Sequence, residues 1–132
     1  MKTRKLKNTT SYGYKKMKMD DDTYKLRRKV IDCIYKAKKL VDLPRIEVRI
    51  VEDCGKVKKV VCGYAYLNSN IVHINKDYLK LSEVDLYGLV LHEIVHAVTG
   101  FGHDDDCYLM NPYLKKGRDL NKTEDTFKKY FK

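Results

Sequence analysis

The stretch EVDLYGLVLHEIVHAVTG, residues 83–100, constrains the fold most, because apolar side chains occupy nearly every side of the helix that it predicts. A helix that is apolar all round belongs in the centre of a domain, covered by other elements. Ser82 stands just before the stretch and Asp85 three residues later, a pattern typical of a helix start, and Gly100 predicts its end. The sequence therefore predicts a buried central helix.

The segments around this helix predict a small α+β domain. Periodicity and breakers place helices at residues 22–43 and 122–132, strands at 45–52, 56–67 and 71–75, and a loop at 101–120. A chain of 132 residues is typical of one domain. We expect residues 23–132 to form it, with a small mixed sheet packed on the N-terminal helix and the buried helix, and a short C-terminal helix last.

Two histidines of the central helix favour a metal site. His92 and His96 are four residues apart, so their side chains share one helix face with Cβ atoms roughly 5–6 Å apart. That spacing suits two nitrogens on one zinc ion, and Glu93 beside them is the general base of the HExxH pattern. The alternative is a pair of core histidines beside an ion-paired glutamate, but burying three polar groups without a partner is costly.

A third ligand is expected after the helix, because catalytic zinc sites use three protein ligands and keep one position open. Gly100 ends the helix, Gly102 offers a turn with positive φ, and His103 follows directly. We expect His103 to complete the site. Its competitors are the carboxylates and the thiol that come next, Asp104, Asp105, Asp106 and Cys107.

The run HEIVHAVTGFGHDDDCYLMNP, residues 92–112, resembles the metzincin metalloproteases, and among them the matrixin-like members. Their signature is HExxHxxGxxH followed by a methionine turn. The resemblance covers about residues 60–112 and implies a minimal zincin fold with a zinc (Zn2+) cofactor. It makes His92, His96 and His103 the ligands and Glu93 the base, and it assigns Met110 and Pro112 to the methionine turn.

The motif departs from the family pattern at one point. Three residues, Ala97, Val98 and Thr99, separate His96 from Gly100, where the family has two. One added residue rotates the exit of an α-helix by about 100°, so either the helix runs longer or the turn is rebuilt. A second resemblance is to SprT-like zincins, DNA-associated proteins whose third histidine is less regularly spaced.

These features predict a zinc-dependent endopeptidase that cleaves peptide or protein substrates, with Glu93 acting on a water at the zinc. The substrate would pair as an added strand along GYAYLN, residues 63–68. Tyr113 either hydrogen-bonds the reaction intermediate or only packs, and His73 is expected as a half-exposed strand residue. The alternative from another class is a non-catalytic, zinc-stabilised interaction or nucleic-acid-binding module.

The net charge and the cysteines allow predictions about the N-terminal segment, the compartment and disulfide bonds. The chain has a formal net charge of +10, much of it in residues 1–22, which we expect to form a flexible basic arm; a nucleic-acid arm or a pro-segment are the alternatives. No signal peptide or membrane span is apparent, which favours a cytoplasmic monomer. The four cysteines are expected as free thiols, with a Cys54–Cys62 disulfide as the alternative.

Overall fold

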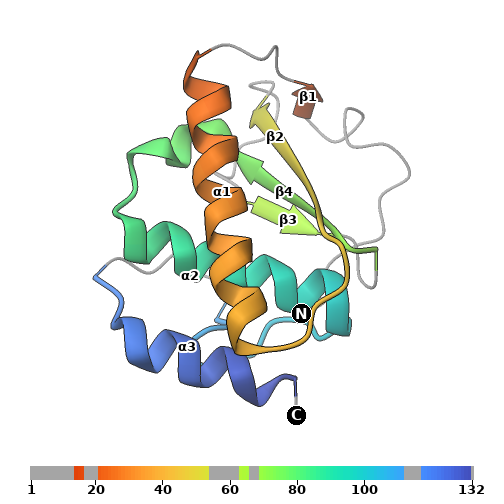
Figure 1. The fold of residues 1–132 in the computed structure, drawn as a ribbon, viewed down its shortest axis with the longest axis vertical. Coiled ribbons are helices and arrows are strands. Elements are labelled where there is room, and N and C mark those ends of the chain that lie inside the picture. Colours follow the sequence, from red (N-terminus) through yellow and green to blue (C-terminus); the bar gives the residue numbers. More distant parts are fainter. Residues whose placement is uncertain (1–13, 17–20, 54–62, 66–68, 112–116, 132) are drawn as a thin grey trace.

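The computed structural model describes residues 14–16, 21–53, 63–65, 69–111 and 117–131, and Figure 1 shows their arrangement. The elements in chain order are β1 (Tyr14–Lys16), α1 (Asp21–Leu40), β2 (Glu47–Asp53), β3 (Gly63–Ala65), β4 (Ile71–Asn75), the 3-10 helix η2 (Lys76–Lys80), α2 (Glu83–Ile94), the π-helical turn η3 (Val95–Thr99) and α3 (Leu120–Lys129). Helices and strands share one core, which confirms the predicted α+β class.

The strands form one small mixed sheet in the order β1-β2-β4-β3. β2 and β4 are parallel, with Val48 opposite Val72 and Ile50 opposite Ile74, and the other two pairs are antiparallel. These four side chains are buried, whereas Glu47 and Arg49, on either side of Val48 in β2, are exposed. The alternation predicted for residues 45–52 is confirmed from Glu47 to Ile50, but it is not strict over the whole stretch, because Val51 is buried directly after Ile50.

Two helices cover the sheet (Figure 1). α1 contacts β2, and α2 contacts β3, β4, α3 and α1. α1 is amphipathic and buries one stripe, including Leu26, Val30 and Ala37. α2 and η3 are buried at every residue from Asp85 to Ala97, as predicted for a central helix. The Ser82 hydroxyl accepts a hydrogen bond from the Asp85 N–H at 3.2 Å, which confirms the predicted start.

The expectation for His73 is wrong. Its side chain is fully buried on β4, at 0% exposure, where a half-exposed strand residue was predicted. β4 lies between β2 and β3, and four of its five residues are buried. The alternation rule assumes that one face of a strand meets water, and the central strand of this sheet does not satisfy that condition.

The basic N-terminal segment is described only in part. Tyr14–Lys16 forms the edge strand β1, with Tyr14 opposite Asp53, and the division into an arm at 1–22 and a domain at 23–132 stays a prediction. In the described ranges, no helix is long and apolar enough to cross a membrane. Cys33 and Cys107 are free thiols, and the alternative disulfide of Cys54 and Cys62 falls outside the described residues.

Candidate metal centre

Three histidines meet at the end of the central helix. His92 lies in the last turn of α2, His96 in η3, and His103 in the loop beyond. The Nε2 atom of His92 lies 3.1 Å from the Nε2 atoms of both His96 and His103, and the three residues offer ligand atoms that all lie within 4.8 Å of one another. Two nitrogens at about 2.0–2.1 Å from one tetrahedral zinc would be roughly 3.3 Å apart. The three side chains are thus close enough to hold one metal ion. His103 lies beside the pair, as expected, and its role as a metal ligand stays a prediction.

Hydrogen bonds at the Nδ1 atoms of His92 and His96 determine which ring nitrogen carries the proton. The Nδ1 atom of His92 lies 2.7 Å from the Leu109 carbonyl oxygen, and that of His96 lies 2.7 Å from the Phe101 carbonyl oxygen. A carbonyl can only accept, so each Nδ1 carries the proton and each Nε2 presents a lone pair. Two lone pairs facing each other at 3.1 Å repel unless a cation lies between them. The donor set therefore fits a metal, with the carbonyls orienting the rings as outer partners do.

Burial keeps these imidazoles neutral. Removal from water lowers the pKa of His92 to about 3 and that of His103 to about 4, and it lowers the pKa of His96 as well. Metals bind the neutral imidazole. The site is therefore in its binding form at neutral pH and does not have to lose protons first.

Glu93 follows the first histidine and is almost fully buried, at 3% exposure. Its Oε1 atom has no hydrogen-bond partner within the described part of the chain. Burial raises the pKa of this carboxyl to about 8. A cation bound beside it would favour the carboxylate and lower that pKa again. The geometry thus supplies a proton acceptor whose charge depends on an occupied metal site.

The extra residue of the motif is absorbed in the π-helical turn η3, residues Val95–Thr99. A π turn closes its hydrogen bond over one residue more than an α turn, and it commonly occurs as a single turn within an α-helix. Gly100 then reverses the chain with φ 79°, and its N–H bonds the His96 carbonyl at 3.2 Å. The exit remains directed toward His103, which answers the question raised by the longer spacing.

The role expected of Gly102 is wrong. The glycines with positive φ among the described residues are Gly100 and Gly117. The reversal is complete at Gly100, directly after the π turn, so Gly102 does not need a left-handed conformation. The prediction that Gly100 ends the helix is confirmed.

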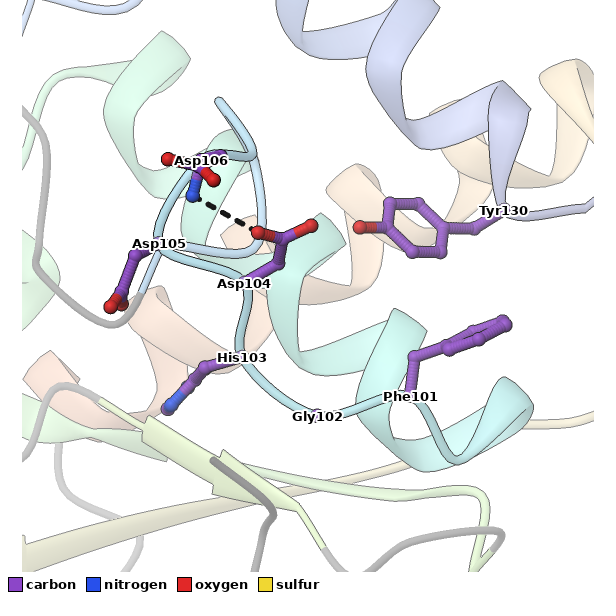
Figure 2. A pocket seen from close by; sticks show the side chains of 7 residues that line it. All are labelled: Phe101, Gly102, His103, Asp104, Asp105, Asp106 and Tyr130. Carbon is purple, nitrogen blue, oxygen red and sulfur yellow. Dashed lines mark hydrogen bonds between the residues drawn. The ribbon is translucent and has the colours of Figure 1, made fainter.

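Asp104 and Cys107, the competitors for the third position, have other partners. Figure 2 shows the Asp104 carboxylate pointing toward Tyr130, while the His103 ring points to the other side of the loop. Asp104 accepts the Asp106 N–H at 3.0 Å. An open pocket is lined by the loop from Phe101 to Asp106, His103 included, together with Tyr130. The Cys107 sulfur accepts the Tyr130 hydroxyl at 3.2 Å. Neither side chain belongs to the histidine cluster.

The segment after the helix returns along the histidine-bearing face of α2 and bonds to it repeatedly. Beyond the two carbonyls that hold His92 and His96, the Asp85 carboxylate accepts the N–H groups of Gly117 at 3.1 Å and Arg118 at 3.0 Å. Burial alone would raise the pKa of Asp85, but these N–H groups lower it below its ordinary value. Asp85 thereby fixes the far end of the segment that orients the histidines.

Sequence reasoning missed a second contact of this kind. An ideal Cβ on Gly88 would lie 2.2 Å from Cδ and 2.8 Å from Cζ of Arg118, whose side chain is buried against the helix. The signal was a glycine in the interior of a buried helix, which usually marks close packing. Gly88 thus leaves space for the return segment one turn before His92.

The segment that was predicted to form a methionine turn is described in part. Met110 is fully buried beside Leu109, and its carbonyl accepts the Asp104 N–H at 2.9 Å. A buried methionine here is what a hydrophobic floor near the histidines requires. Pro112 and Tyr113, which were predicted to support the site, fall outside the described residues.

No protein-family model matches this chain, and neither a curated protein sequence nor a solved structure matches it. The geometry of the histidine cluster is therefore the basis on which a function can be proposed.

Proposed function

We propose that this protein is a zinc-dependent metallopeptidase of the metzincin type, with an endopeptidase activity. The observation that carries the proposal is the pair of Nε2 lone pairs of His92 and His96, held 3.1 Å apart beside the buried carboxyl of Glu93. His103 supplies the third nitrogen. Three histidines with a neighbouring glutamate and an open fourth position are typical of hydrolytic zinc sites.

The chemistry divides between the ion and the chain. A bound zinc ion would polarise the peptide carbonyl and lower the pKa of water at its open position. Glu93 accepts the proton of the attacking water and passes it to the nitrogen of the leaving amine. The carbonyls of Leu109 and Phe101 keep the rings of His92 and His96 oriented throughout. The Oε1 atom of Glu93 has no hydrogen-bond partner among the described residues, which leaves it able to accept that proton.

The strand β3 supports binding of an extended peptide. It pairs with β4 on one side, takes no described strand on the other, and contacts α2. An open strand edge beside the metal centre can pair with the backbone of a substrate, as an added strand. This is the basis for proposing that residues 63–68 position the scissile bond.

Two other functions are distinguishable. A non-catalytic, zinc-stabilised module would explain the three histidines but not Glu93, because a structural site has no use for a buried carboxyl whose Oε1 atom has no partner among the described residues. A SprT-like, DNA-associated protease would share the same chemistry and add nucleic-acid binding, which the net charge of +10 favours.

The test is cleavage of casein by the zinc-loaded chain, compared with Glu93→Gln. We expect the variant to bind one zinc per chain and to lose about 10²- to 10⁴-fold of the activity, the usual contribution of a general base. Glu83→Gln is the matched control, since Glu83 is exposed in the first turn of the same helix. Equal cleavage by both variants would remove Glu93 from the mechanism. Zinc binding without cleavage by any of the three proteins, together with unfolding on zinc removal, would establish the non-catalytic module.

A further inference from the structure

The outward side of α1 combines cations with exposed aromatic rings, although it lies on a different helix from the metal centre. We call this set the α1 outer face; its members are all exposed and comprise Tyr24, Lys25, Arg28, Lys29, Tyr35, Lys36 and Lys39. The opposite side of α1 packs on β2 and α2. The two sides of this helix are therefore chemically distinct.

The two tyrosines are unusually open to solvent. Tyr24 is 54% exposed and Tyr35 61% exposed, and Phe101 and Leu120 are the other large hydrophobic side chains found exposed among the described residues. Positions 24, 28, 35 and 39 follow the spacing i, i+4, i+11, i+15, which places them in one stripe along the helix. The rise of 1.5 Å per residue separates the two rings by about 16 Å along the axis, with Arg28 between them.

The charge of this face is not neutralised. α1 carries seven Lys or Arg residues against three Asp. Among the described residues, the ion pairs occur on β2 and α3, and neither involves this face. Arg27 shows the contrast, since it turns inward and bonds the Val48 carbonyl. Asp32 is the acid in the middle of the stripe.

We propose that the α1 outer face binds single-stranded nucleic acid. The cations would contact phosphates, and the rings of Tyr24 and Tyr35 would stack on unpaired bases, which is how many proteins bind single strands without sequence preference. An acidic protein would pair with the cations, but two single rings about 16 Å apart along the helix do not form the contiguous apolar centre of a protein interface. A membrane surface would require an apolar stripe of Leu, Phe or Trp, and this face has none.

The experiment measures binding of the full-length chain to fluorescent poly(dT) over a series of salt concentrations. We expect Tyr24→Ala and Tyr35→Ala each to weaken binding by roughly 5- to 150-fold, the usual effect of losing one stacking ring. Arg28→Gln and Lys36→Gln should each reduce the slope of log K against log salt by about 0.7, the single-strand value per phosphate contact. Asp32→Asn should tighten binding.

Matched controls separate this face from the general positive charge. Lys128→Gln with Lys129→Gln removes two exposed cations from α3 and should leave the affinity within about 3-fold. Circular dichroism melts check that each variant is folded. Unchanged affinity in both tyrosine variants would overturn the proposal and assign the binding to charge elsewhere. Equal affinity for polyglutamate, or for phosphatidylserine vesicles, would also overturn it, because those partners offer charge without bases.

Discussion

α1 and α2 pack on each other and on the same sheet, and they differ in whether their polar residues are exposed or buried. In α1 the charged side chains reach water on one face, so their presence needs no partner inside the protein. In α2 and η3 every residue from Asp85 to Ala97 is buried, and His92, Glu93 and His96 are buried with the rest. The comparison shows that a polar residue indicates a function when it is buried, because an exposed polar residue needs no further explanation.

The largest effect that would test this contrast is loss of the metal. His96→Ala removes one of three ligands, and we expect zinc affinity to fall by at least about 100-fold, since loss of an outer partner alone costs 10- to 100-fold. Zinc at 100 times its Kd should stabilise the native chain by about 2.7 kcal/mol and the variant by no more than about 0.4 kcal/mol. A chelator competition titration and thermal melts measure both quantities.

Lys36→Ala, on the solvent side of α1, is the control and should leave zinc affinity unchanged. Retention of native zinc affinity by His96→Ala would mean that the three histidines do not form the metal site.

The next effect concerns the pH dependence of stability in the metal-free chain. The pKa of Glu93 rises from the ordinary value of 4.5 to about 8 on folding. Between these values the folded chain holds more protons than the unfolded chain, so the free energy of unfolding falls as pH rises, by up to about 1.4 kcal/mol per pH unit. His92 acts in the other direction, because its pKa is lowered from 6.5 to about 3 and stability is lost as pH falls below 6.5.

Denaturant unfolding between pH 5 and pH 9 measures these slopes. We expect Glu93→Gln to abolish the decline above pH 6.5, whereas Glu83→Gln at the exposed start of α2 should keep it. A decline that survives in Glu93→Gln would show that another group causes it.

The smallest predicted effect is a change in the free energy of unfolding on substitution of Gly88 in α2, compared with substitution of an exposed residue of α1. Gly88→Ala improves helix propensity by about 1 kcal/mol but forces a Cβ into Arg118, and overpacking costs about 1–3 kcal/mol. We expect a net destabilisation of about 1 kcal/mol, against less than about 0.5 kcal/mol for Asp32→Ala on α1. Urea unfolding gives the values. In an Arg118→Ala background Gly88→Ala should no longer destabilise, and a cost that persists there would refute the packing argument.

Local patterns predicted much of the fold and most of the site. The alternation of residues 47–50, the strand 71–75 and the cap at Ser82 depend on neighbours in sequence, and all three are confirmed. The pairing of His92 with His96 follows from helical spacing alone, and His103 follows from the chain reversal at Gly100. Each of these inferences spans about ten residues or fewer.

Features that depend on distant parts of the chain were not predictable in this way. His73 is buried because β4 is central in the sheet. The order of strands in a sheet cannot be predicted from the sequence of one strand. The contact of Asp85 with Gly117 and Arg118 joins residues more than thirty positions apart. The π turn adds a third case, since the same five residues would satisfy an α-helical pattern equally well.

The π turn η3 affects how a metal-binding motif is recognised in a sequence. A search with a fixed gap of two residues between the second histidine and the glycine would reject this chain, although its three imidazoles converge. The number of residues between two helical positions does not fix their relative orientation, because a π turn contains more residues than an α turn. Spacing rules for metal motifs should therefore admit one extra residue wherever a helix ends in a glycine, and judge the candidate by where the nitrogens meet.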